Sequence, residues 1–394
     1  MSRVVRSLRN ALGRPSVVLF ACMFASQAGL LVLSPILPEL AREYGVSTAT
    51  AGQLRTLSGA TGGMTAVLLT VLPRRPALRT LLSVGAALLT VGSLLSGAAP
   101  SFTVLAAGQG LIGVGVGVLV AIAIAAAGEW SEPSDRPRTL AWAIAGMPSA
   151  WVFGMPIAGA AAAIDWRVAW LAVPATTGVL ALLLLRLAPH DRPAAAPRRG
   201  RAAWRRPDVA RFTAGELLAN AAWAGVLTYA GSWLIEDCGT SRGTAAAGLA
   251  IAAAAMVPGT FMGRRGASRP SASLLSALTL AQGGSIAVLG ALRPGAGLTL
   301  GVLTVMACVN GWRSVIASAL GMDSSPDDKV TVMSMRAAAN QFGYLLGAAL
   351  GGVALAAGGF AVLGTTFSAL YVLGALLHVA PRSTLEPSCA EAAA

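Results

Sequence analysis

Residues 102–128 read FTVLAAGQGLIGVGVGVLVAIAIAAAG and contain no charged side chain. A bilayer core about 30 Å thick needs roughly 20 apolar residues of helix, so this stretch is long enough to cross it. Similar apolar windows recur near residues 16–38, 49–72, 77–98, 139–163, 168–188, 210–235, 243–263, 271–292, 294–321, 331–357 and 359–380. Backbone groups in lipid must be paired within their own segment, and a barrel would show short alternating strands. The pattern therefore predicts an all-α membrane protein with twelve transmembrane helices.

The composition argues against a water-soluble protein. Of the 394 residues, 55% are apolar and 11% are charged, whereas soluble domains carry about 25% charged residues. The first window is uncharged and too long for the core of a signal peptide, so we expect it to be retained as a helix. The four cysteines form no CxxC pair, and the two histidines lack metal-ligand spacing. We therefore expect no disulfide framework, no metal and no cofactor.

Positive charge is distributed unevenly between the loops. If the N-terminus lies inside, the outer loops keep only Arg42, Arg167, Arg242 and Arg293. The inner ends and loops hold Arg3, Arg6, Arg9, Arg14, Arg74, Arg75, Arg79, Arg136, Arg138, Arg264, Arg265, Arg269, Lys329, Arg382 and the arginines of a loop near residues 186–211. This asymmetry predicts cytoplasmic termini in a bacterial inner membrane. The net charge of +13 then faces anionic headgroups, and no nucleic-acid partner is expected.

A repeat at an offset of 193 residues divides the chain into halves. It pairs Pro133 with Pro326, Asp135 with Asp328, Arg136 with Lys329, Gly154 with Gly347 and Gly159 with Gly352. We predict one six-helix bundle over residues 1–188, a basic cytoplasmic linker over 189–209, and a second six-helix bundle with a short tail over 210–394. Parallel repeats of this kind are typical of transporters that rock about a central site.

Two motifs carry a family resemblance. The fifth window contains Gly154-Met155-Pro156-Ile157-Ala158-Gly159, followed by Asp165-Trp166-Arg167, and the loop after the eighth window contains the run from Gly259 to Gly266, GTFMGRRG. Over its whole length the chain resembles the major facilitator superfamily, and within it the twelve-span bacterial drug:proton antiporters of the arabinose-efflux-like group. The resemblance implies an antiporter motif at Gly154, Pro156 and Gly159. It also implies cytoplasmic gating loops at Arg74, Arg75, Gly259, Arg264 and Arg265.

Charged side chains at membrane depth are expensive and therefore mark functional sites. Glu216 shares a helical stripe with Thr213, Asn220 and Trp223. A buried carboxyl there can carry a proton for coupling, or it can act as a latch with Arg211 or Arg313. Arg313 and Arg55 are candidates for holding an anionic group or balancing Glu216. We expect Arg313 to reach toward the cytoplasmic surface and Arg336 to be interfacial.

The resemblance implies that the first, fourth, seventh and tenth helices line a central cavity. The residues that we expect to line it, including two from the eleventh helix, are Phe24, Gln27, Gln109, Asn220, Trp223, Asn310, Asn340 and Tyr344. Gln27 and Gln109 stand where relatives of this kind often carry an acidic residue and an arginine. Aromatic walls with a few amides suit an amphipathic organic molecule better than a sugar.

Several functions compete on these grounds. A pump driven by ATP is disfavoured because no G-x-x-x-x-G-K-[ST] motif is present, and a channel has no need of repeated halves. We expect a monomeric, non-enzymatic secondary transporter in the lipid bilayer that exports a small drug-like or antibiotic-like molecule in exchange for protons. The alternatives are a uniporter or importer of a small metabolite and, remotely, a membrane-embedded enzyme.

Overall fold

The computed structural model describes residues 11–46, 48–71, 76–162, 164–189, 206–240, 242–324 and 329–379. Every regular element within these ranges is helical. The earlier elements are α2 (Pro15–Leu31), α3 (Leu33–Glu43), α4 (Thr48–Val71), α5 (Leu78–Gly97), α6 (Phe102–Glu129), α7 (Arg136–Ser149), the π-helix η1 (Ala150–Gly154), α8 (Met155–Ala162), α9 (Trp166–Trp170), the π-helix η2 (Leu171–Ala175) and α10 (Thr176–Leu185). The later elements are α12 (Pro207–Ser232), the π-helix η3 (Trp233–Asp237), α13 (Arg242–Ala254), α14 (Met256–Ala267), α15 (Ala272–Leu292), α16 (Ala296–Asp323) and α17 (Lys329–His378).

Eight helical runs in the described residues are long and apolar enough to cross a membrane. They are Leu78–Gly97, Phe102–Glu129, Arg136–Ala162, Trp166–Leu185, Ala247–Ala267, Ala272–Leu292, Ala296–Asp323 and Lys329–His378, and Pro15–Leu31 is a shorter apolar helix. The predicted all-α membrane fold is confirmed, whereas the predicted number of spans is not. The eight runs omit α4 and α12, which are rich in glycine and polar residues, and they count α17 once although its backbone is non-helical at Gly358 and Gly359.

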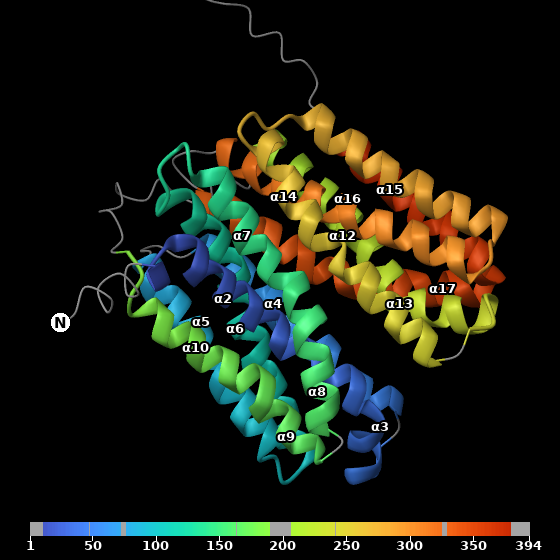
Figure 1. Ribbon diagram of the computed structural model, residues 1–394, viewed down its shortest axis with the longest axis horizontal. Helices are drawn as coiled ribbons and strands as arrows, with labels where there is room; N and C mark the ends of the chain where they lie inside the picture. The colour runs from blue at the N-terminus through green and yellow to red at the C-terminus, as the bar shows by residue number, and fades with distance from the viewer. Residues whose placement is uncertain are drawn as a thin grey trace, which may run out of the picture.

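The helices gather into two groups (Figure 1). Helices α2 to α10 lie together, and α12 to α17 lie together. The groups meet where α7 packs on α14 and where α4 and α6 pack on α17. From there the ribbons diverge, toward α3 and α8 in the first group and toward α13 in the second. The two groups are called the first and second bundle below.

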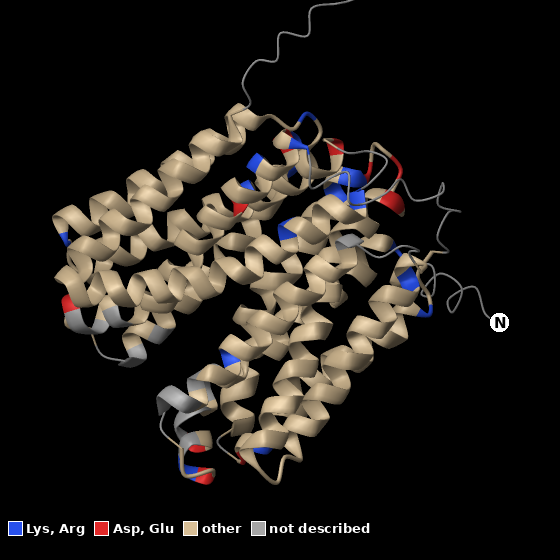
Figure 2. Cartoon of the chain, turned by 180° about the vertical axis from the view of Figure 1, so that it is seen from behind, with Lys and Arg blue, Asp and Glu red and all other residues tan. Residues whose placement is uncertain are grey.

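Most charged residues lie toward two opposite ends of the molecule (Figure 2). We call one end the basic end; its charges include Arg79, Arg186, Arg138, Arg264 and Lys329. Helices α5, α7, α12 and α17 begin there, and the bundles meet on this side. The other end, called the far end, carries the ion pairs of Arg167 with Glu43 and of Arg293 with Asp237.

Small residues allow the helices within each bundle to approach closely. A Cβ added to Gly117 of α6 would collide with the Gly62 carbonyl of α4, and one added to Gly259 of α14 would collide with the Cys308 carbonyl of α16. Helix association in membranes depends on such close packing, because the lipid offers no hydrophobic driving force between helices. Equivalent helices of the two bundles, α4 with α6 and α14 with α16, are therefore joined in the same way.

Proline explains two of the π-helical turns, η1 and η2. Pro156 follows η1 and has no N–H to bond the Val152 carbonyl, and Pro174 lies inside η2. The hydroxyl of Thr176 donates to the Leu171 carbonyl at 2.8 Å, and the hydroxyl of Thr177 donates to the Val173 carbonyl at the same distance. Carbonyl groups at a break in a membrane helix are satisfied by neighbouring hydroxyls in this way.

Candidate functional site

Glu216 lies at the centre of a buried charged cluster in the second bundle. Its Oε1 accepts a hydrogen bond from Arg313 Nη1 at 2.6 Å, and its Oε2 accepts one from Arg336 Nε at 2.8 Å. His378 Nε2 lies 3.5 Å from Glu216 Oε1. The side chains of Glu216, Arg313 and His378 are 0% exposed, and that of Arg336 is 10% exposed. These four residues are called the charged cluster below.

The residues of the cluster come from three helices, and one of these helices contributes two residues. Glu216 lies on α12 and Arg313 on α16, while Arg336 and His378 lie on α17 before and after Gly358 and Gly359. A straight helix from Arg336 to His378 would be about 63 Å long. Both residues reach one carboxylate only because the chain reverses between them, at Gly359, whose φ of 65° favours glycine.

The structure selects between the sequence-based alternatives for the partners of Glu216. Arg313 pairs with it, whereas Arg211 donates to the Val379 carbonyl at 2.7 Å. The prediction of a surface-reaching Arg313 is wrong, because its side chain is buried, and Arg336 is buried against Glu216 as well. A carboxylate at this depth costs several kcal/mol unless it is paired, so it draws both guanidinium groups inward.

Amide side chains lie next to the cluster on α12 and α16. Asn220 Nδ2 donates to the Glu216 carbonyl at 2.7 Å, and the Asn310 side-chain oxygen accepts from Gln282 Nε2 at 3.4 Å. Asn220 and Trp223 are 9% and 8% exposed. Asn220 and Trp223 thus lie one and two turns after Glu216 on α12, and Asn310 lies one turn before Arg313 on α16.

Arg55 lies where the two bundles meet. Its Nη1 donates to the Leu30 carbonyl of α2 at 2.6 Å, and its guanidinium carbon is 5.8 Å from the centre of the Tyr344 ring on α17. Asn340, one turn before Tyr344, is half-buried. Arg55 is therefore separate from Glu216, and it is held by a carbonyl and an aromatic ring, with no carboxylate partner among the described residues.

The first bundle contributes an aromatic wall on α2. Phe24 lies 6.2 Å from Phe20 between ring centres, and Phe20 packs edge-on against Trp142 of α7. Gln27 is 4% exposed and accepts a hydrogen bond from Trp151 Nε1 at 3.3 Å. Gln27 therefore contacts the π-helical part of the fifth predicted span, where the antiporter motif begins, and Phe24 lies one turn earlier on α2.

Gln109 does not join the other predicted cavity residues. It is fully buried between α5 and α6, and its Nε2 donates to Ser96 Oγ at 3.1 Å. The neighbouring Gly108 lies so close to α5 that a Cβ on it would overlap the Ser96 side chain. The helical face that carries Gln109 is used for packing within the first bundle.

The three residues of the predicted antiporter motif have different surroundings. Gly154 is buried, and a Cβ on it would lie 3.0 Å from Leu31 Cδ2. Pro156 is exposed, and a Cβ on Gly159 would meet nothing within 4 Å. Gly154 therefore lies at a close helix contact, whereas Gly159 lies on α8, which diverges from the second bundle (Figure 1).

Contacts across the bundles gather toward the basic end. Lys329 Nζ at the start of α17 donates to Glu129 Oε1 at the end of α6, at 3.1 Å. The Trp142 ring of α7 packs edge-on against the Phe261 ring of α14, with 4.9 Å between ring centres. An ion pair and an aromatic pair thus close this side of the molecule.

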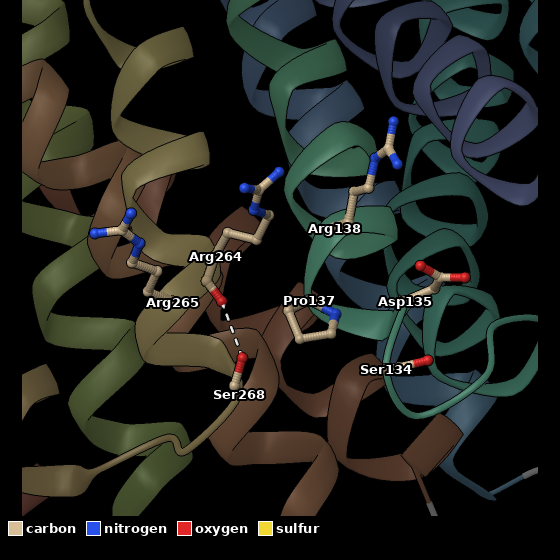
Figure 3. Close-up of a pocket in the computed structure, with 7 residues that line it drawn as sticks. All are labelled: Ser134, Asp135, Pro137, Arg138, Arg264, Arg265 and Ser268. Carbon is tan, nitrogen blue, oxygen red and sulfur yellow. Dashed lines mark hydrogen bonds between the residues drawn. The ribbon is translucent and has the colours of Figure 1, made fainter.

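The predicted gating residues Arg264 and Arg265 border a pocket that crosses the bundles (Figure 3). The pocket is lined by Ser134, Asp135, Pro137, Arg138, Arg264, Arg265 and Ser268 and has a volume of about 230 Å³. It brings the loop before α7 beside the end of α14. Gly259, one turn earlier, forms the close crossing with α16. Arg74 and Arg75 lie outside the described residues.

Asp208 is a second charged group on α12, outside the membrane-spanning part. The hydrogen bond from Arg206 lowers the pKa of this exposed carboxyl. Arg206 also donates to the Ser324 carbonyl at 3.1 Å. This pair therefore ties the start of α12 to the end of α16 within one bundle, in contrast to the pair of Lys329 with Glu129.

Sequence reasoning missed His378 and Tyr371 as members of the site. The two lie seven residues apart and so share one helical face of α17, and both are buried. The one available signal was a histidine inside an apolar window. Among the described residues no group of acidic, histidine and cysteine side chains fits a metal ion.

Two helical bundles with buried charge between polar ends define a membrane transporter. A family model described as Major Facilitator Superfamily matches residues 19–330. The chain therefore belongs to the major facilitator superfamily, a family of multi-pass membrane transporters and not of enzymes.

One curated relative is the "Uncharacterized MFS-type transporter YceJ" of Bacillus subtilis (strain 168), 26% identical over 174 residues. The match covers 44% of this chain and 45% of the relative, so the chain matches less than half of the relative's length. The human organic anion transporter MFSD10 has a TM-score of 0.76 at 14% identity, with 93% of this chain and 99% of that chain covered. The transporter FucP in the outward conformation has a TM-score of 0.76 at 16% identity, with 93% and 98% covered. At these identities the similarity shows the fold.

Proposed function

We propose that this protein is a secondary active transporter that exports a small amphipathic organic molecule, of a drug-like or antibiotic-like kind, in exchange for protons. Transport proceeds by alternating access, in which the two bundles rock about a central site. The observation that carries this proposal is the closure of the bundles toward the basic end combined with their divergence toward the far end. This arrangement corresponds to one of the two states that alternating access requires.

We propose twelve membrane spans with both termini in the cytoplasm. Twelve spans follow when α2–α3 and α12–η3 are each counted once and α17 is divided at Gly358 and Gly359. The bundles comprise residues 1–188 and 210–394, with the linker at 189–209. The basic end is cytoplasmic in a bacterial inner membrane by the positive-inside rule, so the closed side faces the cytoplasm. The protein acts as a monomer.

Proton coupling is assigned to the charged cluster, with Glu216 as the acid and Arg313 as its partner. A buried carboxylate that exchanges partners during rocking is a physical link between protonation and conformation. Rocking of the bundles would change the contact of Arg336 with Glu216, since Arg336 lies on α17, which packs on α4 and α6 of the first bundle. Arg55 holds α2 and α17 together at the same interface.

The residues predicted to line the cavity support the substrate class. Both bundles supply aromatic side chains to this set, namely Phe24, Trp223 and Tyr344, together with the amides of Asn220 and Asn340. Apolar walls with few convergent polar groups suit an amphipathic organic molecule. A sugar needs more hydrogen-bonding groups than these residues supply.

The second candidate is a uniporter or importer of a small metabolite. Gln27 is the observation that favours it, because it is neutral, buried and already bonded to Trp151. The fold is also shared with the Escherichia coli fucose:proton symporter, at 17% identity and a TM-score of 0.75 over 92% of this chain and 97% of that chain. Direction of transport distinguishes the two candidates.

The test begins with a growth-inhibition panel in a pump-deficient bacterial host, with and without this protein. A compound that becomes less toxic is then presented to inverted membrane vesicles, in which export appears as uptake driven by an imposed pH gradient. Export predicts protection and gradient-dependent uptake. Increased toxicity, or uptake unaffected by collapse of the gradient, refutes proton-driven export and favours the second candidate.

The role of Glu216 is tested in the same vesicles. Glu216→Gln leaves two buried guanidinium groups without an anion, and removing one partner of a buried pair costs about 3–5 kcal/mol. Glu216→Asp, which keeps the charge on a shorter side chain, is therefore tested beside it. Asp208→Asn on the same helix is the matched control, since its pair is exposed. If Glu216 couples transport to protons, the dependence of uptake on the pH gradient should change in both Glu216 variants and stay as in the wild type in the control. An unchanged dependence in the Glu216 variants removes Glu216 from the mechanism.

A further inference from the structure

The charged cluster carries an uncompensated positive charge. Glu216 is the carboxylate for two guanidinium groups, those of Arg313 and Arg336. The described part of the chain supplies no second acidic partner to either arginine. With a neutral His378 the cluster therefore has a net charge of +1 at a depth where an uncompensated charge costs several kcal/mol.

One edge of the Arg313 guanidinium is open. Nη1 is bonded to Glu216, whereas Nε and Nη2 are buried and have no hydrogen-bond partner among the described residues. Nε and Nη2 form the side of the planar guanidinium that binds two oxygen atoms of one anion in parallel. Arg313 is fully buried, so water at the surface does not serve these donors.

Two further residues of the second bundle, Tyr371 and His378, have polar groups that are unpartnered within the described ranges. The Tyr371 hydroxyl is buried without a partner in the described chain, and Tyr371 lies two turns before His378 on the same face of α17. Neither His378 nitrogen makes a hydrogen bond to a described residue, although Nε2 is 3.5 Å from the Glu216 carboxylate. Buried polar groups are nearly always hydrogen-bonded, so the two free donors of a fully buried arginine point to a bound species.

We propose that the charged cluster contains a binding site for a small monovalent anion, held by the open Nε–Nη2 edge of Arg313 with Tyr371 as a further donor. The chemistry is one negative charge with hydrogen-bond acceptors. A carboxylate fits the bidentate edge best, and a halide satisfies the same charge. A bound anion brings the cluster to neutrality and uses the orphaned donors of Arg313 and Tyr371.

Anion binding shares Arg313 with the proposed proton coupling, but it can be measured separately. It is an equilibrium property of the second bundle, and it is measurable without a gradient and without the exported compound. Failure of the export proposal therefore leaves it untouched, and the reverse also holds. In the transport cycle the anion would stabilise the arrangement in which Arg313 and Arg336 both face Glu216.

The test is thermal unfolding of the full-length protein in detergent, at fixed pH and fixed sodium concentration. Sodium formate, acetate or chloride replaces sodium isethionate, whose bulky anion does not fit a closed site. A saturable rise of several degrees in the unfolding midpoint is expected, because a ligand that binds only the folded state stabilises it in proportion to ln(1 + [L]/Kd). If formate and acetate saturate the rise in midpoint at much lower concentrations than chloride, the site is a carboxylate site. If only chloride gives a saturable rise, it is a halide site.

Two variants separate binding from a general salt effect. Tyr371→Phe keeps the buried ring and removes the hydroxyl, which should weaken anion affinity about tenfold. Arg313→Gln removes the surplus charge and leaves Glu216 balanced by Arg336. This variant should lose the anion response, and in isethionate it should unfold at or above the wild-type midpoint. A wild-type midpoint that is the same in all four salts, or a response that survives in Arg313→Gln, overturns the proposal and leaves a site filled by water.

Discussion

The pair of Lys329 with Glu129 provides a sharp test of how the bundles are held together. Its atoms are 3.1 Å apart, and the side chains are 14% and 43% exposed. An ion pair this accessible to solvent contributes about 0.2–1 kcal/mol. Glu129→Gln should therefore shift the equilibrium between closed and open basic ends by a factor of about 1.4 to 5 toward the open state.

The assay is a distance distribution between two spin labels across the basic end. The labels replace Ser134 and Ser268, which are exposed and line the pocket from opposite bundles, in a background without the native cysteines. Glu129→Gln should increase the fraction of long distances. Asp208→Asn removes an ion pair at the same end that lies within one bundle, so it should leave the distribution unchanged. Equal shifts in both variants, or no shift in Glu129→Gln, would refute the reasoning.

Three further substitutions test the packing and the motif. Gly63→Leu should favour the open basic end in the same assay, because its Cβ would lie 2.9 Å from the Phe342 ring of the other bundle, whereas Gly59→Leu one turn away meets nothing and should have no effect. Gly259→Leu should lower the unfolding midpoint strongly, by the 1–3 kcal/mol of an overpacked contact or more, since the new side chain would enter the α14–α16 crossing; unchanged melting would contradict this crossing. Gly159→Leu should fold normally, because the side chain has room in this state, but it should slow transport, because it would obstruct the approach of α8 to the second bundle when the far end closes. Transport at the wild-type rate would show that the motif serves only for packing.

Much of the fold was predictable because the membrane restricts the choices. The window at 102–128 corresponds to α6 at Phe102–Glu129, since an uncharged run of that length can only be a helix in lipid. The helical nature of the other windows follows in the same way. The fine structure was not predictable: the π-helical turns near Pro156 and Pro174 depend on how freed carbonyl groups find new partners, which composition does not reveal.

The site was predictable in part. Glu216 and Arg313 were found because charge inside an apolar window is rare. His378 was not connected to them, because its position depends on the reversal of the chain at Gly358 and Gly359. This reversal depends on the backbone torsion angles of these two glycines, which the sequence does not specify. Gln109 was misplaced because a polar residue on a helix can face either a cavity or a neighbouring helix, and only the packed structure distinguishes the two.

The reversal at Gly358 and Gly359 also affects how the molecule can be recognised from outside. Two helical segments of α17 are joined with almost no intervening loop, so this part of the far end offers no flexible peptide to an antibody or a toxin. A ligand that binds here must instead grip the tips of several helices at once. Such a ligand would fit only one arrangement of those tips, and it would therefore select a single conformation of the protein.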